Sequence, residues 1–233
     1  LGKERSYLRA WPNAELSSEH INAYLALVND RQQGKPIAYI IGTREFWSRD
    51  FHVTPDVLIP RPETELIVEN AIEILQKFEY PRFLEVGIGS GCISVSILHD
   101  VEKATAIGLD ISGKALRMVK RNAEKHNVSE RLQLKMSDVF SGLVGEKFDV
   151  IVSNPPYVPN EEIFCLQTEV RDFEPLIALT DGKDGLSIIE NIVQNSPKFL
   201  CQKGFLLMEI GFNQSEKVNQ MFSAEIWQSI EIQ

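Results

Sequence analysis

The chain has 233 residues, of which 43% are hydrophobic, so it can bury a sizeable core in one large domain or in one domain with an appendage. Acidic residues outnumber basic ones by 33 to 24, and the formal charge of −9 counts against sequence-independent binding to nucleic acid, which depends on Lys and Arg. No apolar run reaches the roughly 18 to 20 residues of a membrane span, and no signal-peptide pattern opens the chain. We therefore expect a cytoplasmic protein with no membrane partner.

The cysteines and histidines do not form a metal-binding or disulfide pattern. Cys92, Cys165 and Cys201 are far apart in the sequence, and the four histidines are equally scattered. We expect neither a disulfide framework nor a metal site, and a reducing compartment as the default. The chain begins at Leu1 without a methionine, as a fragment of a longer protein would.

The first part of the chain predicts a helix and then a hairpin. Apolar residues between Leu16 and Asp30 recur at the i, i+3, i+4 and i+7 spacing of an amphipathic helix, after two serines that can cap it. We interpret residues 1–35 as the remnant of a small helical N-terminal module. Residues 36–56 are rich in aromatic and β-branched residues, which predicts a β-hairpin connector from Ala38 to Thr54. Next, a helix is expected from about Pro62 to Phe78, because proline suits the first turn.

A glycine-rich turn between a strand and a helix follows in the segment Arg82 to Leu98. Gly87, Gly89 and Gly91 allow a tight turn and close approach of the backbone to a ligand. Cys92 stands where a dinucleotide-binding G-x-G-x-x-G pattern has its last glycine, which weakens a dehydrogenase interpretation.

Two acidic residues close the next two predicted strands. Asp110 ends the strand Ala104 to Asp110, about 20 residues after the glycines, where a carboxylate can accept hydrogen bonds from both ribose hydroxyls. Alternatively, Asp110 only caps the following helix, a role that Ser112 fills as well. Asp138 follows the strand Leu132 to Met136. Two interpretations stay open for it: either it contacts a ligand, or it is only a turn residue.

The apolar strand Phe148 to Ser153 ends in Asn154-Pro155-Pro156-Tyr157. The two prolines stop the strand and prevent a helix, so they predict a stiff loop at the carboxyl end of a strand, where open α/β sheets bind ligands. Asn154 offers one acceptor and two donors, both prolines leave carbonyl acceptors, and Tyr157 adds a flat ring. This set suits a planar amino group, although a plain Pro-rich strand exit would look similar.

The remaining segments complete an alternation of strands and helices. We predict a helix from Leu186 to Lys198, a strand from Gly204 to Ile210, a helix from about Gln214 to Phe222, and a strand beginning at Ile226. Asp181 to Gly185 lacks the ligand spacing of an EF-hand and is interpreted as a turn. The pattern predicts a doubly wound, mostly parallel α/β sheet of six strands.

Several segments resemble the glutamine methyltransferases of peptide-chain release factors, which belong to the class I S-adenosylmethionine-dependent methyltransferases. The Asn154 to Tyr157 motif is shared with adenine-specific DNA methyltransferases. The segments Gly42 to Phe46, Ile59 to Glu65 and Val170 to Pro175 resemble the release-factor family more specifically. The resemblance implies that residues 57–233 form a Rossmann-like methyltransferase domain without its usual C-terminal strand, and that residues 1–35 serve substrate recognition.

The resemblance also implies a role for each site residue. S-adenosylmethionine is the implied cofactor, with S-adenosylhomocysteine as its product and no metal. The residues implied to bind it are Glu85, Gly87, Ile88, Gly89, Ser90, Gly91, Asp110, Asp138, Val139 and Asn154. Asn154, Pro155 and Tyr157 are implied to be catalytic, and these three with Pro156 to bind the substrate.

The resemblance implies that the partner is a class 1 release factor carrying a Gly-Gly-Gln tripeptide. It also implies that this protein is a monomer and binds no nucleic acid stably. Two other functions stay open. A DNA adenine methyltransferase would need a basic groove and a target-recognition insert, for which the chain has no room. A non-catalytic nucleotide-binding protein would keep the glycines and Asp110 but would not need the segment Asn154 to Tyr157.

Overall fold

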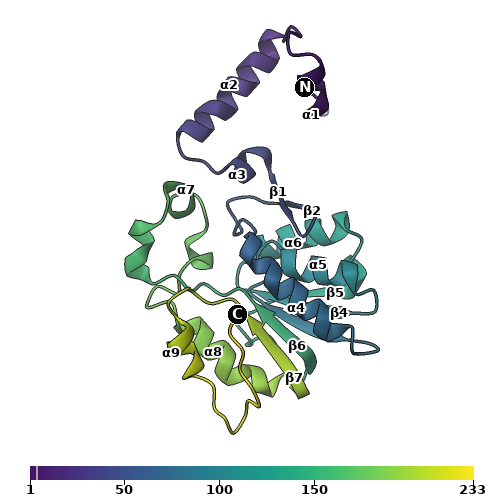
Figure 1. Cartoon of the computed structure of the whole chain (residues 1–233), viewed down its shortest axis with the longest axis vertical. Helices are drawn as coiled ribbons and strands as arrows, with labels where there is room; N and C mark the ends of the chain where they lie inside the picture. The colour runs from purple at the N-terminus through teal and green to yellow at the C-terminus, as the bar shows by residue number, and fades with distance from the viewer. Residues whose placement is uncertain (4) are drawn as a thin grey trace.

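A five-stranded parallel sheet lies at the centre of the protein (Figure 1), as seen in a computed structural model that describes residues 1–3 and 5–233. The strand order is β5-β4-β3-β6-β7, and every neighbouring pair is parallel. The strands are β3 (Arg82–Val86), β4 (Thr105–Asp110), β5 (Leu132–Met136), β6 (Phe148–Ser153) and β7 (Leu200–Met208). The chain adds strands on one side of β3 and then returns to its other side, so the topological switch point lies between β3 and β6. This confirms the predicted doubly wound fold, with five strands in place of six.

Helices cover both faces of the sheet because the inner strands β3, β4 and β6 carry buried apolar residues on both sides. Phe83 and Val150 face a core that also contains residues of three helices, whereas Leu84 and Ile151 face a second core that contains Ile192. The first core is covered by α4 (Glu65–Leu75), α5 (Cys92–Asp100) and α6 (Gly113–Lys125), and the second by α8 (Ser187–Asn195) and the segment after β5.

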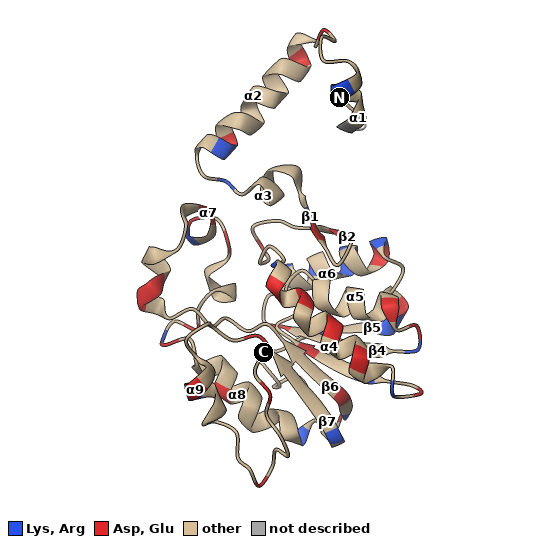
Figure 2. Ribbon diagram, viewed as in Figure 1, with Lys and Arg blue, Asp and Glu red and all other residues tan. Residues whose placement is uncertain are grey.

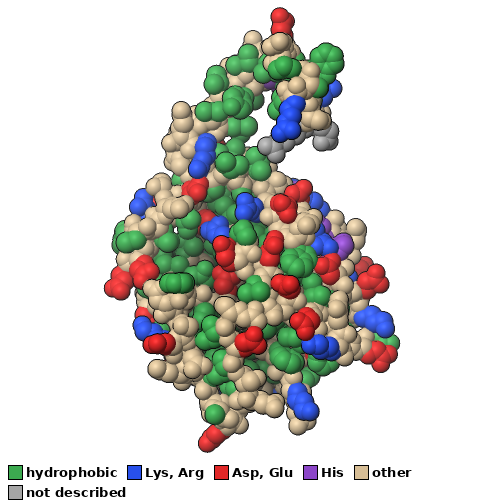
Figure 3. Space-filling view, viewed as in Figure 1, with side chains coloured by type: hydrophobic (Ala, Val, Ile, Leu, Met, Phe, Trp, Pro, Cys, Tyr) green, Lys and Arg blue, Asp and Glu red, His purple; other side chains and the backbone are tan. Residues whose placement is uncertain are grey.

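The N-terminal residues project away from the sheet as helices α1 (Arg5–Ala10) and α2 (Ser18–Gln32), at the top of Figure 1. Helix α2 confirms the helix predicted between Leu16 and Asp30, and the Ser17 side chain caps it by accepting a hydrogen bond from the His20 N–H. None of the α2 residues is buried, and its apolar side chains are exposed in the upper part of Figure 3. Acidic and basic residues are interspersed along the ribbon of the sheet domain (Figure 2). Within the described residues, no helix combines the length and the hydropathy that crossing a membrane requires.

The predicted hairpin is shorter than expected. Its first residues form α3 (Ile37–Ile41), which follows Pro36 and ends at Gly42 in the left-handed conformation, φ 76°. Proline before a helix and glycine after it are the residues that start and stop a helix, and here they outweigh the β-branched composition. The hairpin itself pairs β1 (Thr43–Phe46) with β2 (Arg49–His52) in antiparallel register.

The C-terminal prediction of a strand from Ile226 is wrong, because residues 226–233 form no strand. Strand β7 is the edge of the sheet, and it begins at Leu200 rather than Gly204, with a register shift opposite Phe148. The helix expected from Gln214 to Phe222 is reduced to α9 (Ser215–Asn219).

The helix predicted from Pro62 begins with a 3₁₀ turn, Pro62–Thr64, before α4. Short turns of helix complete the chain: Ser129–Arg131, Asn160–Cys165, α7 (Thr168–Arg171), Leu176–Ala178 and Ser196–Lys198.

Candidate functional site

A cavity of about 310 Å³ opens where β3, β4 and β6 end. Val86 at the end of β3 is paired with Leu109 of β4 on one side and with Ser153 of β6 on the other. The residues that follow these strands therefore meet at one edge of the sheet. Of the residues that the sequence predicted, these line the cavity: Glu85, Gly87, Ile88, Gly89, Ser90, Asp110, Asp138, Val139, Asn154, Pro155 and Pro156.

Two predicted site residues, Gly91 and Tyr157, are not among the residues that line the cavity. Gly91 has φ 80°, and a Cβ there would lie 2.9 Å from the Val119 Cγ1 atom of α6. Glycine at this position therefore lets two helices pack closely after the turn. The Tyr157 ring packs instead against the hydrophobic cluster around Leu186 and Ile189.

The glycine-rich turn is tied to β4 and leaves a backbone surface facing the cavity. Gly87 and Ile88 both donate their N–H groups to the Leu109 carbonyl, at 2.9 Å each. Gly87 and Gly89 have φ values of 73° and 55°, which other residues rarely adopt. The Ile88 side chain lies over Gly108, where a Cβ would be 2.2 Å from its Cδ1 atom. Ile88 can therefore lie beside the cavity only because Gly108 has no side chain.

Glu85 is a buried carboxylic acid at the base of this turn. It is 1% exposed, and burial raises the pKa of its carboxyl group to about 8, although hydrogen bonds to Ser94 oppose the increase. Its Oε2 atom accepts from the Ser94 N–H at 2.9 Å and from the Ser94 hydroxyl. A cation placed beside this buried carboxyl group would favour its charged form and lower its pKa.

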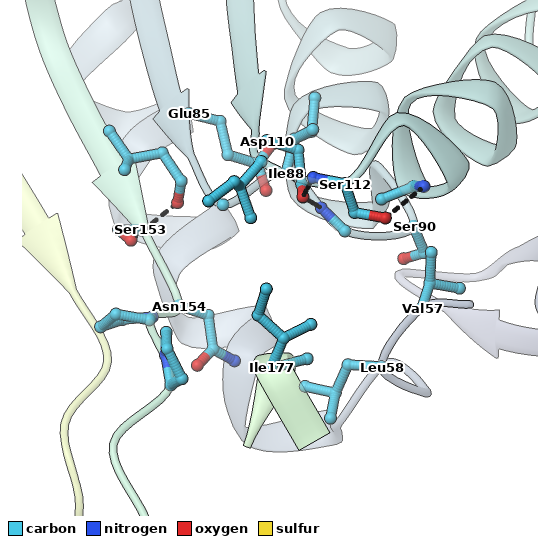
Figure 4. A pocket seen from close by; sticks show the side chains of 18 of the residues that line it. Val57, Leu58, Glu85, Ile88, Ser90, Asp110, Ser112, Ser153, Asn154 and Ile177 are labelled. Atoms are coloured by element: carbon cyan, nitrogen blue, oxygen red, sulfur yellow. Dashed lines mark hydrogen bonds between the residues drawn. The ribbon is translucent and has the colours of Figure 1, made fainter. Parts of the chain in front are cut away.

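Asp110 connects the glycine-rich turn to the start of α6 (Figure 4). Its Oδ2 atom accepts from the Gly89 N–H at 2.9 Å, and its Oδ1 atom accepts from the Ser112 N–H at 2.8 Å. Burial raises the pKa of this carboxyl group, and the two backbone donors oppose the shift. Ser112, not Asp110, caps α6, since its hydroxyl accepts from the Ala115 N–H. The capping alternative for Asp110 is therefore wrong, and its carboxylate oxygens keep further lone pairs for a ligand.

The backbone is strained at Val139, beside the exposed Asp138. Val139 has φ 47°, which is rare for a β-branched residue and costs on the order of 1 to 3 kcal/mol. The Ser137 hydroxyl donates to the Val139 carbonyl at 2.9 Å and holds this conformation. The strained turn places the Val139 side chain, 8% exposed, in the cavity wall.

Asn154 lies across the cavity from Asp110 and Ile88 (Figure 4). Its Nδ2 atom donates to the Thr64 hydroxyl at 3.0 Å. The Tyr157 hydroxyl donates to Glu209 at 3.0 Å, and burial together with this carboxylate raises the pKa of Tyr157. The sequence analysis did not single out Thr64 or Glu209 as site residues, because only the fold brings them to the loop that follows β6.

An ion pair joins two of the segments that carried the family resemblance. Glu174 accepts from the Arg61 guanidinium at 2.6 Å and from the Ile59 N–H at 3.2 Å. The Glu174 side chain is 1% exposed, and burial raises its pKa while Arg61 opposes the shift. Arg61 and Pro175 both line the cavity, so this ion pair connects two segments that contribute to its wall.

The residues that the structure describes include no set of side chains arranged to bind a metal ion. Within residues 1–3 and 5–233, no group of three or more His, Cys, Asp or Glu side chains is placed to hold a metal ion.

Comparison with solved structures places the fold among methyltransferases. A methyltransferase from Pyrococcus furiosus matches with a TM-score of 0.53 and 18% identity, over 88% of this chain and 86% of that one. A ribosomal protein L11 methylase from Lactobacillus delbrueckii subsp. bulgaricus matches with a TM-score of 0.51 and 19% identity, over 72% and 71% of the two chains. The chain therefore shares the Rossmann-like fold of these methyltransferases.

Sequence comparison identifies the family. The family model "Methyltransferase small domain" matches residues 64–169, and "PrmC N-terminal domain" matches residues 1–42. Release factor glutamine methyltransferases of Geobacter sulfurreducens and Escherichia coli K12 are 41% and 38% identical, over 96% and 95% of this chain and 77% and 79% of theirs. A bifunctional methyltransferase of Rickettsia typhi is 38% identical over 90% of this chain, which spans 44% of that protein. The chain belongs to the release factor glutamine methyltransferase family, and it is an S-adenosylmethionine-dependent methyltransferase.

Proposed function

We propose that this protein transfers a methyl group from S-adenosylmethionine to the side-chain amide nitrogen of the glutamine in the Gly-Gly-Gln tripeptide of class 1 release factors. The observation that carries the proposal is the position of Asn154. Its amide stands at the end of β6, beside two prolines and across the cavity from the glycine-rich turn. A planar amino group entering from the outside would meet acceptors there, next to the space for the cofactor.

The cavity residues fit the proposed cofactor. Gly87 and Gly89 expose backbone with no side chain to the cavity, and the buried Glu85 suits the ammonium of the methionine portion. Asp110 suits the ribose hydroxyls, and Asp138 with Val139 suits the adenine ring. The bound cofactor supplies an electrophilic methyl group.

The protein contributes to the reaction mainly by positioning the acceptor. An amide nitrogen is a poor nucleophile because its lone pair is delocalised into the carbonyl group. In our proposal Asn154 Oδ1 and the Pro155 carbonyl accept the two amide hydrogens, which directs the nitrogen toward the methyl group and stabilises the positive charge that develops on it. Tyr157 keeps this loop in place through its ring and its hydroxyl bond to Glu209. The proton leaves during or after the transfer.

The glycines of the tripeptide suit an approach to Asn154 past the residues that line the cavity. A side chain next to the glutamine would collide with the walls formed by Pro155, Pro156 and Ile177, which line the cavity. Residues 1–35 are proposed to contact the rest of the release factor, since their apolar side chains are exposed in α1 and α2. The net charge of −9 disfavours duplex DNA as the substrate.

The test is a competition between a release factor and adenine-containing duplex DNA for labelled methyl groups at low salt, followed by mass mapping of the labelled peptide. Label should appear in the tripeptide glutamine and disappear when that glutamine is changed to alanine. Label in the DNA, or label that persists in the altered release factor, would overturn the proposal. Asn154→Ala should reduce kcat by about 10² to 10³ and leave cofactor affinity nearly intact, which calorimetry measures.

A further inference from the structure

Three side chains form a chain of hydrogen bonds that ends at Asn154. The Thr64 hydroxyl accepts from Asn154 Nδ2 at 3.0 Å and lies 2.6 Å from Glu209 Oε2. Glu209 Oε1 accepts from the Tyr157 hydroxyl at 3.0 Å. Thr64 precedes α4, Asn154 follows β6 and Glu209 follows β7, so only the folded protein brings them together.

The chain has a fixed direction. A carboxylate can only accept hydrogen bonds, so Thr64 must donate its single hydroxyl hydrogen to Glu209. The Thr64 oxygen then has only lone pairs to offer, and Asn154 must face it with its NH₂ group. The Asn154 Oδ1 atom is consequently turned away from Thr64 and remains able to accept from another group.

Packing alone would not select this orientation. The oxygen and the nitrogen of a side-chain amide are nearly equal in size, so a rotation by half a turn changes the hydrogen bonds and leaves the shape unchanged. After that rotation Asn154 would direct an NH₂ group toward the NH₂ group of the substrate, and both groups would be donors. An orientation fixed by hydrogen bonds is thus required for the acceptor role proposed for Asn154.

Thr64 and Glu209 are themselves held by backbone hydrogen bonds, Thr64 within its helical turn and Glu209 to the end of β6. Thr64 is 2% exposed, and its N–H donates to the Arg61 carbonyl at 3.2 Å. The Glu209 N–H donates to the Ser153 carbonyl at 3.0 Å, directly beside Asn154. Motion of Glu209 would therefore disturb the end of β6 itself.

We propose that Thr64 and Glu209 are positioning residues that hold Asn154 with its Oδ1 atom directed at the amide of the substrate. This inference rests on the proposed function, in which Asn154 Oδ1 accepts one amide hydrogen. It assigns a role to Thr64, in the segment Pro62–Glu65 that begins α4, and to Glu209.

The first test compares Thr64→Val with Thr64→Ser. Valine keeps the branched shape and removes the hydroxyl, whereas serine keeps the hydroxyl. Thr64→Val should lower kcat by about 10-fold to 100-fold, the loss typical of a misplaced reacting group, with KM for the release factor and the cofactor dissociation constant within about threefold. Thr64→Ser should restore most of kcat. Thr105→Val, an exposed site at the opposite end of the sheet, is the matched control and should behave as the wild type.

A double-mutant cycle shows whether Thr64 acts through Asn154. In the Asn154→Ala background, which has no amide to orient, Thr64→Val should cause no further loss of kcat. An equal, additive loss in both backgrounds would overturn the inference, since it would reveal a general structural effect. Wild-type kcat in Thr64→Val together with a large loss in Asn154→Ala would overturn the inference and leave the proposed function standing. Wild-type kcat in Asn154→Ala would overturn the inference together with the acceptor role proposed for Asn154, whereas the proposed substrate is tested separately by the labelling competition.

Glu209→Gln tests the chain from its other end and does not depend on how Thr64→Val folds. A glutamine amide can donate to Thr64, which then no longer has to present lone pairs to Asn154. We expect kcat to fall by about tenfold, again only when Asn154 is present. An unchanged kcat in a folded Glu209→Gln protein, checked by thermal unfolding, would refute the role of Glu209.

Discussion

Replacing Glu85 by Gln should change how the stability of the protein depends on pH. Burial raises the pKa of Glu85 from 4.5 to about 8, although the Ser94 N–H and hydroxyl donate to it. The folded protein therefore keeps a proton on Glu85 at pH values where the unfolded chain has lost it. Because the folded state binds more protons, the free energy of unfolding falls as the pH rises from about 4.5 to about 8, and it levels off above that range.

The size of the effect follows from the pKa shift. The slope reaches at most about 1.4 kcal/mol per pH unit, so the advantage of Glu85→Gln over the wild type should be roughly 3 to 4 kcal/mol larger at pH 8 than at pH 5. Glutamine is uncharged throughout and keeps an oxygen for the Ser94 N–H. Urea unfolding of both proteins from pH 5 to pH 9 at constant ionic strength measures the difference, and other titrating groups cancel. A difference that stays constant over this range would refute the reasoning.

The same pair of proteins tests the proposed position of the cofactor. An ammonium group beside Glu85 would lower the pKa of its carboxyl group, because the cation favours the charged form. Saturating S-adenosylmethionine should therefore stabilise the wild type more strongly at pH 8 than at pH 6, relative to Glu85→Gln. An equal gain in both proteins at each pH would place the ammonium elsewhere.

Three further substitutions test the site and the contacts that support it. Asp110→Ala should weaken cofactor binding by about 10-fold to 100-fold through the loss of charge-assisted hydrogen bonds, and calorimetry showing wild-type affinity would remove Asp110 from the site. Gly185→Ala should lower the free energy of unfolding by about 1 to 3 kcal/mol and slow methyl transfer, because Gly185 has φ 76° and a Cβ would lie 2.1 Å from the Tyr157 carbonyl oxygen. Wild-type turnover in that variant would show that the loop accommodates the change. Asn122→Ala should cost about 2 to 4 kcal/mol in urea unfolding, because the buried Asn122 side chain bonds both backbone groups of His52, and a loss below about 1 kcal/mol would contradict this.

Much of the site could be predicted because strand ends are visible in the sequence. Glu85, Asp110 and Asn154 stand in or after apolar runs that stop at glycines, a serine or prolines. In a parallel sheet the carboxyl ends lie at one edge, so residues that close different strands meet. This geometric rule, more than any single motif, brings the three side chains to one cavity, as the structure shows.

The parts that could not be predicted depend on pairing between distant segments. Ile226 is a residue type that favours strands, but a strand forms only when it pairs with another strand. Residues 226–233 pair with no strand in the structure. Residues Ile37–Ile41 are also β-favouring, and they form a helix because Pro36 and Gly42 set the backbone at both ends. Composition describes a preference, whereas the neighbours decide the outcome.

The hydrogen bonds that Thr64, Glu209 and Gln214 make to the loop Asn154 to Tyr157 show that distant residues fix its position. Its prolines restrict the backbone but contribute no N–H groups, so they cannot tie the loop to the sheet. The ties come from side chains: Thr64 bonds Asn154, Glu209 bonds Tyr157, and Gln214 Nε2 donates to the Tyr157 carbonyl at 2.9 Å. Prolines make the loop stiff and these three bonds give it a defined position, and an amide acceptor that must be oriented for methyl transfer requires both.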